Sequence, residues 1–162
     1  MESLSTLLGQ FIANTKYDDL PSDIVVASKE RILDILSAAT AGSRYWEYND
    51  DIIASMDDIW GDGVATVIGR KAKKPFASAA FINTAFAHAV ELDDGHKNAG
   101  MHAGAVVVPT ALAIGEKMHC SGKDIILSIV LGYELAYRFA SNMCPALINN
   151  GFHPSAVCGS VG

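Results

Sequence analysis

The sequence is poor in cysteine and has no cysteine motif that would staple the fold or bind zinc. It has an odd number of cysteines, namely Cys120, Cys144 and Cys158, and no two of them have Cys-x-x-Cys spacing. A disulfide framework needs an even set and a zinc knuckle needs closely spaced pairs, so neither is indicated. We expect reduced thiols, which are usual in cytoplasmic proteins.

Long hydrophobic runs and an excess of positive charge are also absent. Half of the residues are hydrophobic, but no apolar run reaches the roughly 18 residues that a membrane span needs. The opening MESLSTLLGQ lacks the basic region of a secretory leader. Eighteen acidic residues against twelve basic ones give a net charge of −6, which argues against a nucleic-acid binder. The sequence therefore predicts a cytoplasmic protein that binds neither nucleic acid nor membrane.

Apolar residues recur at helical spacing along most of the chain. Helices are expected over residues 4–12, 21–42, 52–59, 75–90, 105–117 and 121–136. Pro109 is expected in the first turn of its helix, because the missing N–H of proline would have no partner there anyway. Ser121 begins the last of these helices with a Ser-x-x-Asp pattern that resembles a capping box.

One short segment favours a strand instead. Residues 65–69 (ATVIG) are β-like and follow a Gly-Asp-Gly turn, so they are interpreted as one arm of a hairpin. The basic run at 70–74 is interpreted as a solvated turn. The fold prediction is an all-α or nearly all-α helical bundle, a single domain over residues 1–162, with at most a short β-hairpin near 65–69.

A polar, titratable stretch lies between two of the apolar helices. Residues 87–104 (AHAVELDDGHKNAGMHAG) contain three histidines, three carboxylates and a lysine, together with glycines at 95, 100 and 104. Loops that are held between rigid elements often carry function. A solvated interhelical loop is the alternative, but the density of titratable groups favours a site.

Three kinds of chemistry compete for these residues. A metal site is the less favoured of them, because the spacing from His96 to His102 fits no helical ligand motif such as His-x-x-x-His. A nucleophilic site is weaker still, since Ser155 follows His-Pro without a Gly-x-Ser-x-Gly elbow. Acid–base chemistry on a small carboxylate fits best, because histidine titrates near neutral pH. His88 falls on the buried helix and is interpreted as a core histidine.

Four segments in order resemble the MmgE/PrpD family of 2-methylcitrate dehydratases and cis-aconitate decarboxylases. They are FINTAFAHAVELDDGH, HAGAVVVPTALAIGEK, SGKDIILSIVLGYELAYR and GFHPSAVCGSVG. The resemblance implies an all-α main domain with a separate lid domain, and dimerisation. It also implies lyase or isomerase chemistry on small di- and tricarboxylates, by dehydration, decarboxylation or epimerisation, without a metal or another cofactor.

The candidate site residues follow from matching the chain to the family pattern. The expected catalytic residues are Asp93, His102 and His153, and the expected substrate-binding residues are Glu91, Asp94, His96 and Lys97. Each has a structural alternative, such as a loop or turn cap for Asp93 or Asp94 and a solvated position for Lys97. Lys97 or a protonated histidine would attract an anionic substrate into a negatively charged protein.

Members of this family run to several hundred residues. We therefore expect the chain to be the N-terminal part of such an enzyme, without the lid domain and the C-terminal helices, and incomplete on its own. It would act on a small polycarboxylate as a homodimer or together with a missing second half. The alternative is a non-catalytic truncated remnant or a helical interaction module.

Overall fold

The computed structural model describes residues 2–162, apart from the side chains at 58–60, and its architecture is mostly helical. The elements in chain order are α1 (Leu4–Asn14), the 3-10 turn η1 (Tyr17–Asp19), α2 (Ser22–Tyr45), α3 (Asn49–Trp60), β1 (Ala65–Thr66), β2 (Lys73–Lys74), α4 (Phe76–His88), α5 (Ala103–Met118), α6 (Gly122–Met143), α7 (Ala146–Asn149) and α8 (Pro154–Gly159). The prediction of a nearly all-α fold with one short hairpin is confirmed.

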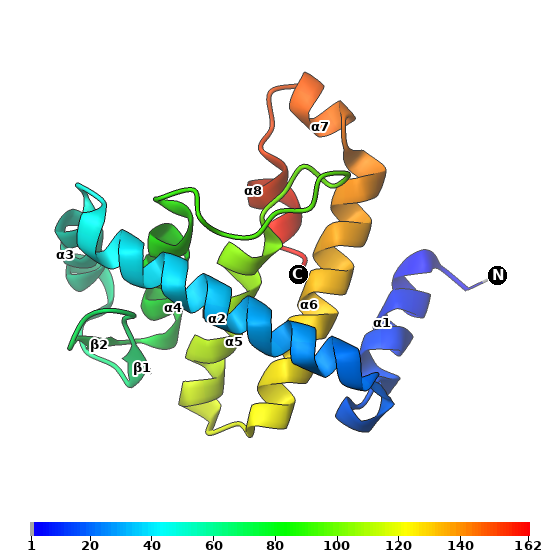
Figure 1. Ribbon diagram of the computed structural model, residues 1–162, viewed down its shortest axis with the longest axis horizontal. Coiled ribbons are helices and arrows are strands. Elements are labelled where there is room, and N and C mark those ends of the chain that lie inside the picture. The colour runs from blue at the N-terminus through cyan, green and yellow to red at the C-terminus, as the bar shows by residue number, and fades with distance from the viewer. Residues whose placement is uncertain (1) are drawn as a thin grey trace.

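Three helices form the centre of the bundle. Helix α5 packs against α4 on one side and α6 on the other, and the long α2 crosses all three, as Figure 1 shows. The core between them is built from buried Ile35, Ile82, Phe86, Val108 and Ile129. Their burial provides the main driving force for assembly, at roughly 1.5–3 kcal/mol for each fully buried large side chain.

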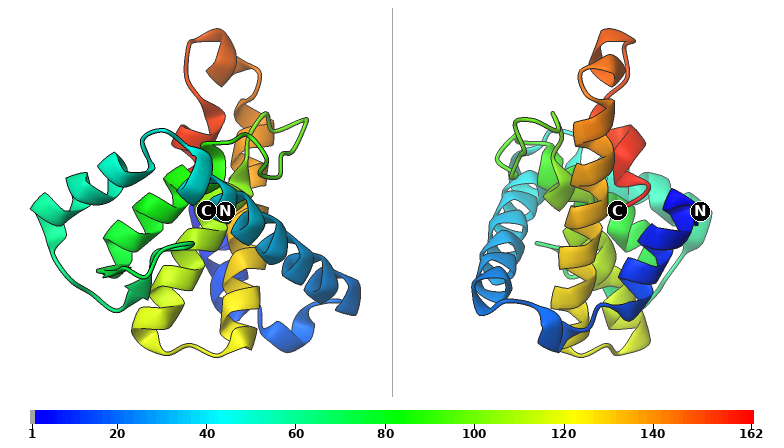
Figure 2. Two further views of the ribbon diagram at one scale, coloured as in Figure 1. Left: turned by 60° about the vertical axis from the view of Figure 1, so that its left-hand side comes forward. Right: turned by 90° about the vertical axis from the view of Figure 1, so that its right-hand side faces the viewer.

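The long loop between α4 and α5 lies at one end of this bundle. Figure 2 shows the loop near α8 and the last turns of α6, while α7 projects beyond them. Helix α8 packs against both α5 and α6. Segments that are far apart in the sequence therefore meet at this end of the molecule.

Local sequence signals set the ends of several helices. Ser121 and Asp124 form the predicted capping box at the start of α6: the Ser121 hydroxyl accepts from the Asp124 amide at 3.3 Å, and Asp124 accepts from the Ser121 amide at 2.9 Å. Ser3 caps α1 by accepting a hydrogen bond from the Thr6 amide at 3.1 Å. Each such cap satisfies backbone N–H groups that the helix itself cannot pair.

The hairpin is shorter than the predicted strand and its second arm lies in the basic run. Ala65 pairs with Lys74 and Thr66 with Lys73 in an antiparallel register. Asn83 of α4 fastens the hairpin, since its amide accepts from the Ile68 N–H and donates to the Thr66 carbonyl, both at 2.8 Å.

Two local predictions are wrong. Lys74 is buried rather than solvated, because its ammonium forms an ion pair with Asp57 of α3 and its backbone belongs to β2. Pro109 lies in the interior of α5 instead of its first turn, because the helix already begins at Ala103. Contacts in the loop before Ala103 hold that earlier start, and the helix tolerates the one backbone bond that proline cannot make.

Within residues 2–162, no helix has both the length and the apolar character that crossing a membrane would require.

Candidate active site

The chain leaves α4 through a sharp reversal. Glu91 adopts a left-handed conformation with φ of 52°, which is uncommon for a residue with a side chain. Its amide donates to the His88 carbonyl at 3.1 Å. The reversal returns Asp93 to the end of α4, where its Oδ2 lies 2.9 Å from Nδ1 of His88.

The other end of the loop is tied to α8. A turn closes where the His96 amide donates to the Met101 carbonyl at 3.0 Å. The His102 amide then donates to the hydroxyl of Ser155 in α8, also at 3.0 Å. His102 is the residue before α5, and its Nδ1 lies 3.4 Å from Asp93 Oδ2.

His88, Asp93 and His102 thus form what we call the histidine–aspartate cluster. The Asp93 side chain has no exposed surface, whereas both imidazoles are one-third exposed, at 33%. The two rings lie 5.1 Å apart between centroids and share one carboxylate oxygen. Among the described residues, Asp93 Oδ1 and His102 Nδ1 are buried without a hydrogen-bond partner. The buried Asp93 carboxylate therefore hydrogen-bonds the His88 ring and lies 3.4 Å from Nδ1 of His102, with bonding capacity to spare.

His153 adds a third imidazole to this end of the molecule. It precedes α8 and is exposed, and its ring centroid lies 6.0 Å from that of His88. The structure therefore gathers the three residues predicted to be catalytic, Asp93, His102 and His153, around His88. Their catalytic roles stay predictions.

Asp94 points away from the cluster into the helix bundle. Its Oδ1 accepts from the Gly104 amide at 3.1 Å, and its Oδ2 accepts from the Tyr133 hydroxyl at 2.9 Å. Burial raises the pKa of Asp94, against the lowering effect of these hydrogen bonds. Burial and the Asp94 charge likewise raise the pKa of Tyr133. Asp94 thus links the loop to the first turn of α5 and to α6.

The other predicted substrate-binding residues lie at the periphery. Glu91 Oε1 lies 3.8 Å from Nε2 of His88. The His96 ring packs on Tyr137 of α6, with centroids 4.6 Å apart, and burial raises the pKa of Tyr137 to about 12. Lys97 is exposed in the turn after His96. The structure brings Glu91 to the cluster and places His96 against α6 instead.

Sequence reasoning missed His88, which was interpreted as a core histidine. Its ring contacts Asp93, and its centroid lies 5.1 Å from that of His102 and 6.0 Å from that of His153. The five-residue separation from Asp93 matches no helical or strand spacing. Only the left-handed turn at Glu91 brings the two side chains together, and nothing at that position of the sequence indicates such a turn.

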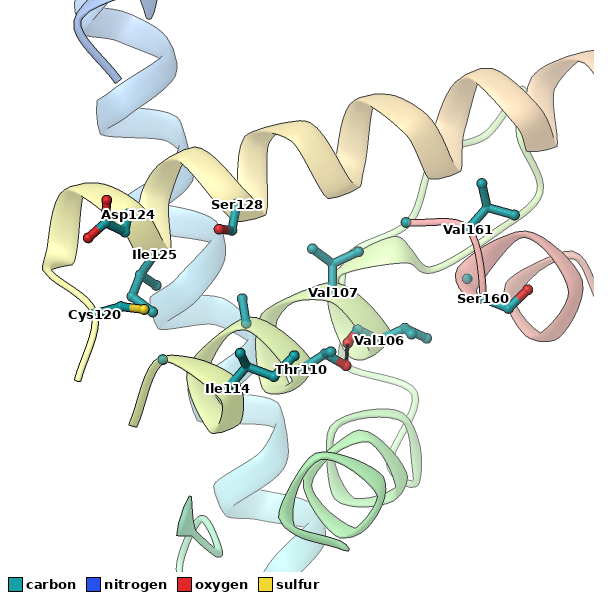
Figure 3. A pocket seen from close by; sticks show the side chains of 14 residues that line it. Val106, Val107, Thr110, Ile114, Cys120, Asp124, Ile125, Ser128, Ser160 and Val161 are labelled. Atoms are coloured by element: carbon teal, nitrogen blue, oxygen red, sulfur yellow. Dashed lines mark hydrogen bonds between the residues drawn. The ribbon is translucent and has the colours of Figure 1, made fainter. Parts of the chain in front are cut away.

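A groove of about 530 Å³ lies elsewhere, between α5, α6 and α8. Figure 3 shows that Val106, Val107, Ile114 and Ile125 contribute much of its wall, with Asp124 at one end. None of the predicted site residues lines it. The groove is therefore separate from the histidine–aspartate cluster.

The cluster can support acid–base chemistry. An aspartate that accepts from one imidazole nitrogen fixes the tautomer and raises the basicity of the other nitrogen. A protonated ring can instead hold a carboxylate through a charge-assisted hydrogen bond. The cluster also offers one possible metal-ligand atom from each of His88, Asp93 and His102, and these atoms lie within 4.8 Å of one another.

Comparison with known proteins gives consistent matches. The family model of the MmgE/PrpD N-terminal domain matches residues 6–162. A cis-aconitate decarboxylase of Aspergillus terreus is 33% identical over 154 residues, which cover 91% of this chain and 31% of that protein. The human cis-aconitate decarboxylase is 26% identical over 173 residues, covering 100% of this chain and 34% of the relative. The chain thus spans about a third of the length of these relatives.

Proposed function

Because the chain belongs to the MmgE/PrpD family, we propose that it forms the N-terminal part of a lyase or isomerase that acts on small di- or tricarboxylates. The chemistry would be dehydration, decarboxylation or epimerisation through proton transfer. The similarity to cis-aconitate decarboxylases supports this substrate class. The region that the relatives have beyond this match would come from further polypeptide or from a second chain.

One observation carries the proposal: Asp93 Oδ2 lies within 3.4 Å of imidazole nitrogens on both His88 and His102. Removing a proton next to a carboxylate requires a base that is poised near neutral pH. An imidazole beside a buried aspartate can accept that proton without a cofactor. We assign the proton transfer to His102 and the orientation of the His102 ring to Asp93. His153 would hold or protonate the substrate from the exposed side.

Substrate attraction is the second requirement, because the chain carries a net charge of −6. A protonated imidazole binds a carboxylate by a charge-assisted hydrogen bond worth about 1.5–3 kcal/mol. His88, His102 and His153 offer three such rings at one end of the molecule. A di- or tricarboxylate could engage more than one ring, so this arrangement favours multiply charged acids.

The test requires an enzyme of full length. Residues 1–162 are joined to the part of the Aspergillus terreus decarboxylase that this chain does not span, and turnover of cis-aconitate, citrate and 2-methylcitrate is measured. We expect His102→Gln and Asp93→Asn each to lower kcat/KM by about 10²–10⁴, the usual effect of removing a general base or its orienting group. His119→Gln is the matched control, because His119 is exposed at the far end of α5.

Two outcomes would contradict the proposal. Values of kcat/KM within a few-fold of the parent for both cluster variants would show that the assigned residues do not carry the chemistry. A folded parent that turns over none of the three acids would favour the non-catalytic alternative.

A further inference from the structure

The histidine–aspartate cluster has bonding capacity that the chain itself does not fill. Asp93 Oδ1 and His102 Nδ1 are both buried, and neither has a hydrogen-bond partner among the described residues. Buried polar atoms in native proteins nearly always have a partner, because an unpaired one loses its hydration without gaining a bond in return. The two unpaired atoms belong to side chains that face each other, so a single ligand between them could satisfy both.

The spacing of the cluster suits a metal ion. Asp93 Oδ2 lies 2.9 Å from His88 Nδ1 and 3.4 Å from His102 Nδ1, and one ligand atom from each residue fits within 4.8 Å. Zinc binds nitrogen and oxygen ligands at about 2.0–2.2 Å in a tetrahedron, which places neighbouring ligand atoms about 3.4 Å apart. The two Asp93 distances lie close to that spacing. The two imidazole nitrogens lie within 4.8 Å of each other, and side-chain rotation would bring them to the same separation.

We propose that His88, Asp93 and His102 bind a divalent transition-metal ion of the zinc class. Two imidazoles and one carboxylate form a donor set that zinc accepts, with the fourth position left to water or to a ligand carboxylate. The charge of the ion would neutralise Asp93, whose side chain is withdrawn from solvent. The exposed edge of the two rings provides the entry path.

Glu91 supports the same site from outside. Its Oε1 lies 3.8 Å from Nε2 of His88, the nitrogen that would not bind the metal. Carboxylates commonly accept from the second nitrogen of a metal-binding histidine and so orient the ring. The left-handed turn at Glu91, with φ of 52°, reverses the chain next to His88.

A bound ion would regulate the chemistry proposed above. It would occupy the imidazole lone pairs that proton transfer needs, so Zn²⁺ would inhibit turnover in competition with the polycarboxylate. This inhibitory consequence rests on the proposed function, whereas metal binding rests on the geometry of the cluster alone. The two ideas can therefore fail separately.

The experiment titrates Zn²⁺ into the purified 162-residue chain by calorimetry in a buffer that does not bind zinc. We expect one tight site per chain, and we expect His88→Gln, Asp93→Asn and His102→Gln each to weaken it at least tenfold. The control is the double variant His119→Gln/Cys120→Ser, which removes an exposed pair of potential zinc ligands outside the cluster. This variant should bind as the parent does.

A second measurement covers variants that fold poorly. Circular dichroism and thermal melting identify folded variants, and His88→Gln changes a ring that is already one-third exposed. In the parent, Zn²⁺ should shift the imidazole NMR signals of His88 and His102 and raise Tm. The absence of a tight site, or a site that disappears only in the His119/Cys120 variant, would overturn the proposal. Zinc binding by this chain, together with no polycarboxylate turnover by the full-length fusion described above, would retain the metal site and refute the proposed function.

Discussion

Replacing Gly104 by alanine should destabilise the protein by disrupting the junction that holds the loop. Gly104 is the second residue of α5, and its position leaves no room for a side chain. A Cβ built there would overlap Asp94 Oδ1 and the Tyr133 hydroxyl, and would lie 2.8 Å from Cδ1 of Ile35. These neighbours come from the loop, α6 and α2, so the clash cannot be relieved by moving one flexible side chain.

The magnitude follows from three contributions. Overpacking a well-filled site costs about 1–3 kcal/mol. Displacing Asp94 breaks at least one of its hydrogen bonds to Gly104 and Tyr133, at about 1.5–3 kcal/mol for a bond to a charged group. Alanine recovers about 1 kcal/mol through its better helix propensity. The net loss should be roughly 1.5–5 kcal/mol, a large part of the 5–15 kcal/mol by which domains are usually stable.

Urea unfolding followed by circular dichroism measures this loss. The matched control is Gly9→Ala in α1, where a Cβ meets nothing within 4 Å, and stability should stay level or rise by up to about 1 kcal/mol. If Gly104→Ala unfolds within about 0.5 kcal/mol of the parent with the same m-value, the packing described at this junction is wrong.

Two further predictions concern Asp94 and Asn83. Burial raises the pKa of Asp94 above 3.8, so the folded state holds its proton more tightly than the unfolded state does. The free energy of unfolding should therefore fall as pH rises from about 4 through the folded pKa of Asp94. Urea titrations across this range should show that Asp94→Asn removes this fall. Equal slopes of unfolding free energy against pH in parent and variant would contradict the assignment. Asn83→Ala leaves the Ile68 amide and the Thr66 carbonyl without their partner, so stability should drop by about 1–3 kcal/mol and the hairpin amides should exchange faster. Unchanged exchange at Ile68 would show that Asn83 does not hold the hairpin.

Much of the helical fold could be predicted because its signals are local. The Ser121–Asp124 capping box and the apolar period behind it identify the start of α6 from the sequence alone. The start of α5 is different, because it depends on contacts made by distant residues. Asp94 accepts from the Gly104 amide and Ser155 accepts from the His102 amide, so α5 begins well before Pro109.

The burial of Lys74 also depends on a residue that is distant in the sequence. Lys74 stands in a basic run that is typical of a solvated turn, and only the position of α3 provides Asp57 as a partner for the buried ammonium. Tertiary pairing of this kind overrides local composition, because a buried ammonium is tolerated once a carboxylate meets it. No residue close to Lys74 in the sequence indicates the pairing.

The candidate site was predicted in part. The density of His, Asp and Glu at 87–104, together with the family resemblance, led to Asp93, His102 and His153, which the structure gathers at one end of the bundle. His88 was missed because its contact with Asp93 depends on the backbone reversal at Glu91. No sequence pattern indicates the apolar groove of Figure 3, which lies between α5, α6 and α8, away from these residues.

The central claim is that His102, oriented by Asp93, moves a proton next to a substrate carboxylate. The most direct test follows deuterium incorporation by NMR when the full-length enzyme described above is incubated with its polycarboxylate in D₂O. The account predicts rapid labelling at the carbon next to a carboxylate in the parent and in His119→Gln, and labelling slowed by about 10²-fold or more in His102→Gln and Asp93→Asn. Labelling at the parent rate in both cluster variants would contradict it.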